Sequence, residues 1–144
     1  MPVELREQAF DPWLSLSEFQ VQRRLAARRS GATAAFVGTM REINEGDDVS
    51  ALTLEHYPGM TERELERIVA GAMAQWSLDE ALVIHRVGRM QPGDPIVLVA
   101  VWSAHRKAAF EACRHIMEML KSRAPFWKHE DLGDRQRWVE SNTP

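Results

Sequence analysis

A run of basic residues lies between His105 and His129 in a chain that is acidic overall. This run contains six lysines and arginines and two glutamates, a formal charge of +4 in a protein whose net charge is −3. A solvated helix face is the usual explanation for such a run. The alternative is a site for an anion, because lysine and arginine side chains are common partners of phosphate and carboxylate. The basic residues are Arg106, Lys107, Arg114, Lys121, Arg123 and Lys128.

Two of these lysines could do chemistry. Lys121 and Lys128 flank the corner Ser-Arg-Ala-Pro-Phe-Trp, where Pro125 must end a helix because the residue before a proline avoids helical geometry. The corner would bend the chain back, so both amino groups can point into one cleft. Like charge and partial burial each lower the pKa of a lysine, and a lysine with a lowered pKa can act as base or nucleophile. Two structural roles compete: a C-terminal charge offsetting a helix dipole for Lys121, and protection of an exposed strand edge for Lys128.

His105 and Arg106 supply a second possible anion site. They follow a continuously apolar strand and open a helix. The free backbone amides at a helix start favour an anion, and arginine adds a planar fork for phosphate. The residues by themselves therefore predict lysine-assisted chemistry on a phosphate-bearing small molecule.

Other kinds of site lack the residues that they need. The five histidines form no pair four residues apart, and with one cysteine there is no zinc ligand set, so no metal is predicted. Glycine-rich phosphate loops are also missing, and no cofactor is predicted. Cys113 falls on the apolar stripe of its helix and is expected to be a buried structural thiol.

Composition bounds the class of protein. With 144 residues, of which 44% are hydrophobic and 27% charged, residues 1–144 are expected to form one domain. No apolar run approaches the roughly 20 residues that span a bilayer, and no signal peptide is visible. The single cysteine fits a reducing compartment, so we expect a cytoplasmic protein. The acidic balance argues against nucleic-acid binding.

Hydrophobic periodicity predicts the elements that must position these residues. Helices are predicted over residues 16–29, from residue 61 to Trp76, and over residues 106–122. The first two of these follow capping boxes over residues 15–18 and 61–64. Strands are predicted over residues 3–10, 32–40, 50–57, 81–87, 95–102, 126–130 and 137–140.

Two features of this order indicate how the strands are arranged. The strand over residues 95–102 is continuously apolar and should be central. The strand over residues 50–57 should pair antiparallel with the one over residues 32–40, across a polar loop over residues 41–48. Hairpins mixed with three helices predict an α+β fold with a largely antiparallel sheet.

Six short motifs resemble the large, catalytic subunit of molybdopterin synthase. They occur in order between residues 32 and 140, at spacings consistent with that family. The motifs are Phe36-Val-Gly-Thr-Met-Arg41, Leu52-Thr-Leu-Glu-His-Tyr-Pro-Gly-Met60, Ile84-His-Arg-Val-Gly88, Ser103-Ala-His-Arg106, Ala109-Phe-Glu-Ala112 and Leu120-Lys-Ser-Arg-Ala-Pro-Phe-Trp-Lys128.

The resemblance implies a fold, a reaction and an assembly. The fold is of α/β hammerhead type, and the protein is a homodimer that binds two small ubiquitin-like subunits to form a heterotetramer. The C-terminal Gly-Gly of each small subunit carries a thiocarboxylate and threads into a pocket of the large subunit. Its sulfur is transferred to cyclic pyranopterin monophosphate, and two such transfers make the dithiolene of molybdopterin.

The resemblance also assigns residues. Lys121 and Lys128 are the reactive lysines, and Phe36 and Met117 line the channel for the partner's tail. Substrate-binding positions fall on Thr39, Met40, Arg41, His105, Arg106, Lys121, Lys128, His129 and Glu130. Arg41, His105 and Arg106 would hold the pterin phosphate, with Arg41 reaching across the dimer.

One departure and one alternative accompany this resemblance. The segment over residues 45–48 is unusually acidic for a neighbour of Arg41. The alternative function is a non-catalytic dimeric module that binds a phosphorylated metabolite and uses the lysines only as charges.

Overall fold

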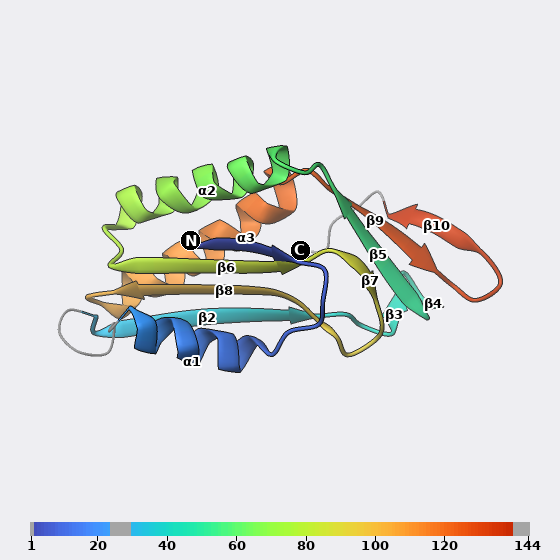
Figure 1. The fold of residues 1–144 in the computed structure, drawn as a ribbon, viewed down its shortest axis with the longest axis horizontal. Coiled ribbons are helices and arrows are strands. Elements are labelled where there is room, and N and C mark those ends of the chain that lie inside the picture. Colours follow the sequence, from blue (N-terminus) through green and yellow to red (C-terminus); the bar gives the residue numbers. More distant parts are fainter. Residues whose placement is uncertain (1, 24–29, 140–144) are drawn as a thin grey trace.

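Two four-stranded sheets, a short hairpin and three helices make up the part of the chain that the structure, a computed structural model, describes (Figure 1). The structure describes residues 2–23 and 30–139. The last part of the helix predicted over residues 16–29 and the end of the strand predicted over 137–140 lie outside this range. The observed architecture agrees with the predicted α+β class, because the helices accompany mostly antiparallel strands.

The first sheet has a buried central strand and two outer strands. Its order is β1 (Val3–Arg6), β6 (Glu80–Arg86), β8 (Pro95–Ser103) and β2 (Ala32–Thr39). Only the pairing of β1 with β6 is parallel among these four strands. Strand β8 lies inside the sheet and its last seven residues are buried, which confirms the prediction that it is central. Strand β2 is at one edge of the sheet.

The second sheet crosses the end of the first at a steep angle (Figure 1). Its order is β10 (Gln136–Val139), β9 (Phe126–Asp131), β5 (Ala51–His56) and β7 (Gly88–Met90), antiparallel throughout. The chain passes from the first sheet to the second between β6 and β7. Gly88 has a φ of +87° at this bend, which is a conformation that residues with a side chain rarely adopt.

Two predictions about the middle of the chain are wrong. Strand β5 pairs with β7 and β9 and not with β2, because it belongs to the other sheet. The predicted loop over residues 41–48 contains a hairpin of β3 (Ile43–Asn44) and β4 (Asp47–Asp48). Glu45 and Gly46 both have positive φ, as a two-residue turn between strands of right-handed twist requires.

The helices cover both faces of the first sheet. Helices α2 (Met60–Trp76) and α3 (Arg106–Arg123) pack on one face, and α1 (Pro12–Gln22) packs on the other through Phe19, whose ring lies 5.3 Å from that of Trp102. None of the described helices is long and apolar enough to cross a membrane. Cys113 is buried on α3 as predicted, and burial raises the pKa of its thiol to about 11.

Both predicted capping boxes are wrong, because each helix starts earlier in the chain. Helix α1 begins at Pro12, and the Asp11 side chain accepts hydrogen bonds from two amides of the first turn. Helix α2 begins at Met60, and Glu62 accepts a hydrogen bond from the Gly59 amide. The fully buried Thr61 hydroxyl instead bridges to the carbonyl of Pro125, where the chain leaves α3.

Candidate active site

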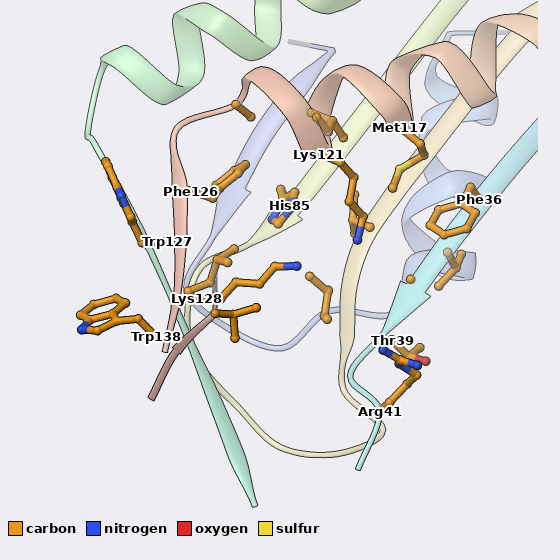
Figure 2. Close-up of a pocket in the computed structure, with 18 residues that line it drawn as sticks. Phe36, Thr39, Arg41, His85, Met117, Lys121, Phe126, Trp127, Lys128 and Trp138 are labelled. Carbon is orange, nitrogen blue, oxygen red and sulfur yellow. The ribbon is translucent and has the colours of Figure 1, made fainter. Parts of the chain in front are cut away.

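A cavity of about 740 Å³ lies where the end of β2, the C-terminal half of α3 and strand β9 meet (Figure 2). Lys121 and Lys128 line it together with Thr39 and Arg41. A smaller pocket of about 120 Å³ shares these four residues and adds Met40 and Glu130. The two lysines therefore share one cleft, which the sequence had left as a possibility.

Local structure explains how the two lysines meet. Lys121 is in the last turn of α3, and Ala124 then adopts an extended conformation before Pro125, so the helix ends as predicted. The chain reverses into β9, where Lys128 follows Phe126 by two residues. Side chains two apart on a strand point to the same face, so both face the cavity.

The surroundings of the two lysines lower the pKa of both amino groups. Burial lowers the pKa of Lys121, and the nearby charge of Arg41 lowers it further. Burial also lowers the pKa of Lys128, and Lys121 and Arg41 add to this effect while Glu130 opposes it. A larger share of each side chain is therefore an uncharged amine near neutral pH than for a solvated lysine, and such an amine can act as base or nucleophile.

Stability should depend on pH through Lys128. Because its pKa is lower in the folded state than the 10.5 of the unfolded chain, the folded state binds fewer protons between those two values, and stability rises with pH there. Lys128→Met should therefore be more stable than the wild type at neutral pH, with a gap that narrows as the pH approaches 10.5. Urea unfolding of both proteins at several pH values measures this gap. A gap that is constant with pH would contradict the lowered pKa.

The acidic hairpin beside Arg41 is neutralised by another arginine. Arg137 of β10 donates to Glu130 and Asp47 at 2.9 and 2.8 Å, and Glu45 lies 3.7 Å away. Glu130 is only 5% exposed and also accepts a hydrogen bond from Asn44. The hairpin is thus tied to β9 and β10 and leaves Arg41 available to the cavity.

Glu130→Ala should cost stability because it removes the buried centre of this network. Loss of a buried charged partner that holds two hydrogen bonds costs roughly 1–3 kcal/mol. Glu118→Ala is the matched control, because Glu118 forms an ion pair with Arg114 on an exposed helix face, where such pairs contribute at most about 1 kcal/mol. Urea unfolding of both variants measures the loss in free energy of unfolding. Equal losses would show that the buried Glu130 network contributes no more than the exposed ion pair.

The structure separates the other predicted anion-binding residues. Arg41 lies in the same cavity as the lysines of its own chain, which differs from the expectation that it reaches across the dimer. His105 and Arg106 are exposed at the start of α3, whereas Lys121 is at its end. At 1.5 Å per residue the two ends are roughly 20–25 Å apart. A single chain does not bring all three predicted phosphate ligands together.

The remaining predicted residues divide between the cavity and its surroundings. His129 lies on the opposite face of β9 from Lys128, against the ring of Trp138 at 4.8 Å. Met40 is buried but borders the smaller pocket. Phe36 and Met117 line both the main cavity and a groove of about 870 Å³ between β2 and α3.

Sequence reasoning missed His85. It lines the cavity from β6, and its ring is stacked on Phe126 at 4.2 Å. The sequence feature that could have indicated it is the position of His85 in β6, where the alternate residues Ala81 and Val83 are core residues. A polar ring at such a position needs a partner, and this one has the carbonyl of Arg86 at 2.9 Å.

Fold and site together define a class of protein. It is an α+β protein with a cationic pocket in which two lysines of lowered pKa adjoin an arginine, and this arrangement suits amine-assisted chemistry on an anionic substrate.

Known proteins identify the family within this class. The sequence model of the MoaE protein family matches residues 12–123. The molybdopterin synthase catalytic subunit of Ralstonia nicotianae is 53% identical over 130 residues, which are 87% of this chain and 74% of the relative. That of Pseudomonas aeruginosa is 46% identical over 97% of this chain and 91% of the relative. The chain belongs to the MoaE family of molybdopterin synthase catalytic subunits, which are sulfurtransferases.

A solved structure agrees with this assignment. The crystal structure of molybdopterin synthase from Staphylococcus aureus superposes with a TM-score of 0.85 at 28% identity and covers 98% of each chain.

Proposed function

We propose that the chain transfers sulfur from the C-terminal thiocarboxylate of a small ubiquitin-like subunit to cyclic pyranopterin monophosphate, forming the dithiolene of molybdopterin. The observation that carries this proposal is the pair of lysines with lowered pKa beside Arg41. Arg41 supplies a fixed positive charge for the substrate's anionic groups. An uncharged lysine can accept a proton or attack a carbonyl carbon, and a protonated one can stabilise negative charge as it develops.

The groove between β2 and α3 offers a path for the partner's tail. It shares Phe36, Met117 and Lys121 with the main cavity, so a chain lying in it would end at the reactive lysine. Strand β2 is at the edge of its sheet and can hydrogen-bond to an extended peptide. A Gly-Gly terminus has no side chains to exclude it from a narrow channel.

The assembly follows from where His105 and Arg106 lie. If these residues hold the pterin phosphate, a second protomer must bring them to the lysines, because their own chain holds them at the far end of α3. We therefore propose a homodimer with shared sites, joined by two small subunits in a heterotetramer. Residues 1–144 would act as one domain, and a cytoplasmic location fits a chain whose single cysteine is a buried free thiol.

Reconstitution tests the proposed reaction. The protein is mixed with a thiocarboxylated small subunit and cyclic pyranopterin monophosphate, and dithiolene is measured in a single turnover. Product formation is the expected result. Retention of the pterin without product would instead support the alternative of a non-catalytic dimeric module for a phosphorylated metabolite.

Substitutions at three positions should separate pterin binding from small-subunit binding. Arg106→Ala, and likewise His105→Ala, should weaken pterin binding roughly 10- to 150-fold, because a charge-assisted phosphate contact is lost, while binding of the small subunit changes little. Phe36→Ala should do the reverse, since Phe36 lines the groove. Titration of each variant with both ligands measures the split. If Arg106→Ala weakens only the small subunit, Arg106 belongs to a protein interface instead.

A further inference from the structure

His85 occupies a position where the fold alone would favour an apolar residue. It continues the row formed by Ala81 and Val83 on the face of β6 that packs under α2 and α3. Its backbone is paired with β1 on one side and β8 on the other, so the ring is carried by a rigid part of the sheet. Burying an imidazole there costs desolvation that a valine would not.

The hydrogen bond of His85 determines which ring nitrogen carries the proton. Nδ1 lies 2.9 Å from the carbonyl oxygen of Arg86. A carbonyl can only accept, so Nδ1 is protonated and donates to it. Burial lowers the pKa of His85 to about 4, and the charges of Lys128 and Lys121 contribute. The ring is therefore neutral, and Nε2 is left as an acceptor.

The stacking partner holds the His85 ring at the cavity that the two lysines line. The His85 ring lies against Phe126, and Lys128 follows Phe126 on the same face of β9. Figure 2 shows His85 between Phe126 and Lys128, facing the cavity. The charged groups around it are Lys128 of β9, Lys121 of α3 and Arg41 after β2, with Glu130 in the adjoining pocket.

We propose that His85 is a positioning residue for sulfur transfer: its Nε2 accepts a hydrogen bond from the amino group of Lys128 and so directs the rest of that group toward the substrate. This role rests on the proposed function. A neutral ring suits it, because a protonated one would add a further cation to a pocket that already holds two lysines and an arginine. Its pKa of about 4 makes it a poor base near neutral pH.

A purely structural role for His85 would depend on the other ring nitrogen, Nδ1. If His85 serves only to satisfy the carbonyl of Arg86 where the chain leaves the first sheet, Nδ1 is the nitrogen that matters. Two substitutions each preserve the hydrogen-bonding function of one ring nitrogen. His85→Asn retains a donor near the position of Nδ1 and removes the acceptor. His85→Gln places an amide oxygen near the position of Nε2 and loses the donor.

The two roles therefore give different results in the reconstituted assay. We expect His85→Asn to lower the single-turnover rate roughly tenfold or more while binding of both ligands and thermal stability stay close to wild type. His85→Gln should retain a rate within a few-fold of wild type. The reverse order, with His85→Gln losing stability and rate together, would overturn the proposal. His115→Asn is the control, because His115 lies on α3 against Trp76 and outside the cavity.

A measurement without substrate tests the proposal without any substitution at His85. Nitrogen-15 NMR of the imidazoles in the wild-type protein should show an unprotonated Nε2 for His85 at pH 7, and this resonance should move in Lys128→Met. A protonated Nε2, or no response to the loss of Lys128, would overturn the proposal. This result does not depend on whether sulfur transfer is the reaction, so a failure of the proposed function is separately visible as a wild-type protein that makes no dithiolene.

Discussion

Lys121→Ala should reduce dithiolene formation by roughly 10²- to 10⁴-fold, the loss typical of removing a group that transfers a proton or attacks in the reacting complex. Lys121 is in the last turn of α3, lines the main cavity, and has a pKa lowered by burial and by Arg41. It also borders the groove between β2 and α3. Among the described residues, Lys121 is the only one that lines the main cavity, the smaller pocket and this groove. We therefore expect no other side chain to replace it.

The fold should survive this change. Ending the side chain at Cβ removes a charge whose burial is unfavourable, and alanine has the highest helix propensity. Thermal unfolding and single-turnover rates are measured side by side. Lys107→Ala is the control, an exposed lysine in the first turns of the same helix. Wild-type rates from a folded Lys121→Ala protein would remove Lys121 from the mechanism.

Mixing two inactive proteins should restore activity if the sites are shared between protomers. With pterin kept well below the weakened Kd of Arg106→Ala, we expect that variant and Lys121→Ala each to be nearly inactive alone, because one has lost the phosphate ligand and the other the reactive amine. In a mixed dimer one site then receives both wild-type residues and the other receives both lesions. Random exchange makes half of the dimers mixed, so about a quarter of all sites should regain activity.

A second pair of variants serves as the matched control. Arg41 and Lys121 line one cavity within a single chain. A mixture of Arg41→Ala with Lys121→Ala should therefore regain nothing, since every site in a mixed dimer keeps one lesion. Exchange is verified in both mixtures with a tagged protomer. If neither mixture recovers despite exchange, His105 and Arg106 do not serve the lysine pocket.

Local signals in the sequence determined the parts of the site that lie close together in the chain. Pro125 ends α3 and turns the chain back, so Lys128 returns toward the helix end that carries Lys121, and both side chains line one cleft. The apolar strand β8 and the buried Cys113 were likewise predictable from residue type and spacing. Such features depend on neighbouring residues, for which periodicity and proline geometry are direct guides.

Features that depend on distant pairing were decided only by the tertiary structure. Strand β5 joins β7 and β9, and nothing in its own alternation specifies that partner over the preceding β2. The same applies to Arg41, which lies beside the lysines while the β3–β4 hairpin binds Arg137. It also applies to His105 and Arg106, which lie at the opposite end of α3 from Lys121. His85 entered the site for the same reason: a strand shows which residues are buried, but only the packing of β9 beside β6 determines that Phe126 and the lysines are what it meets.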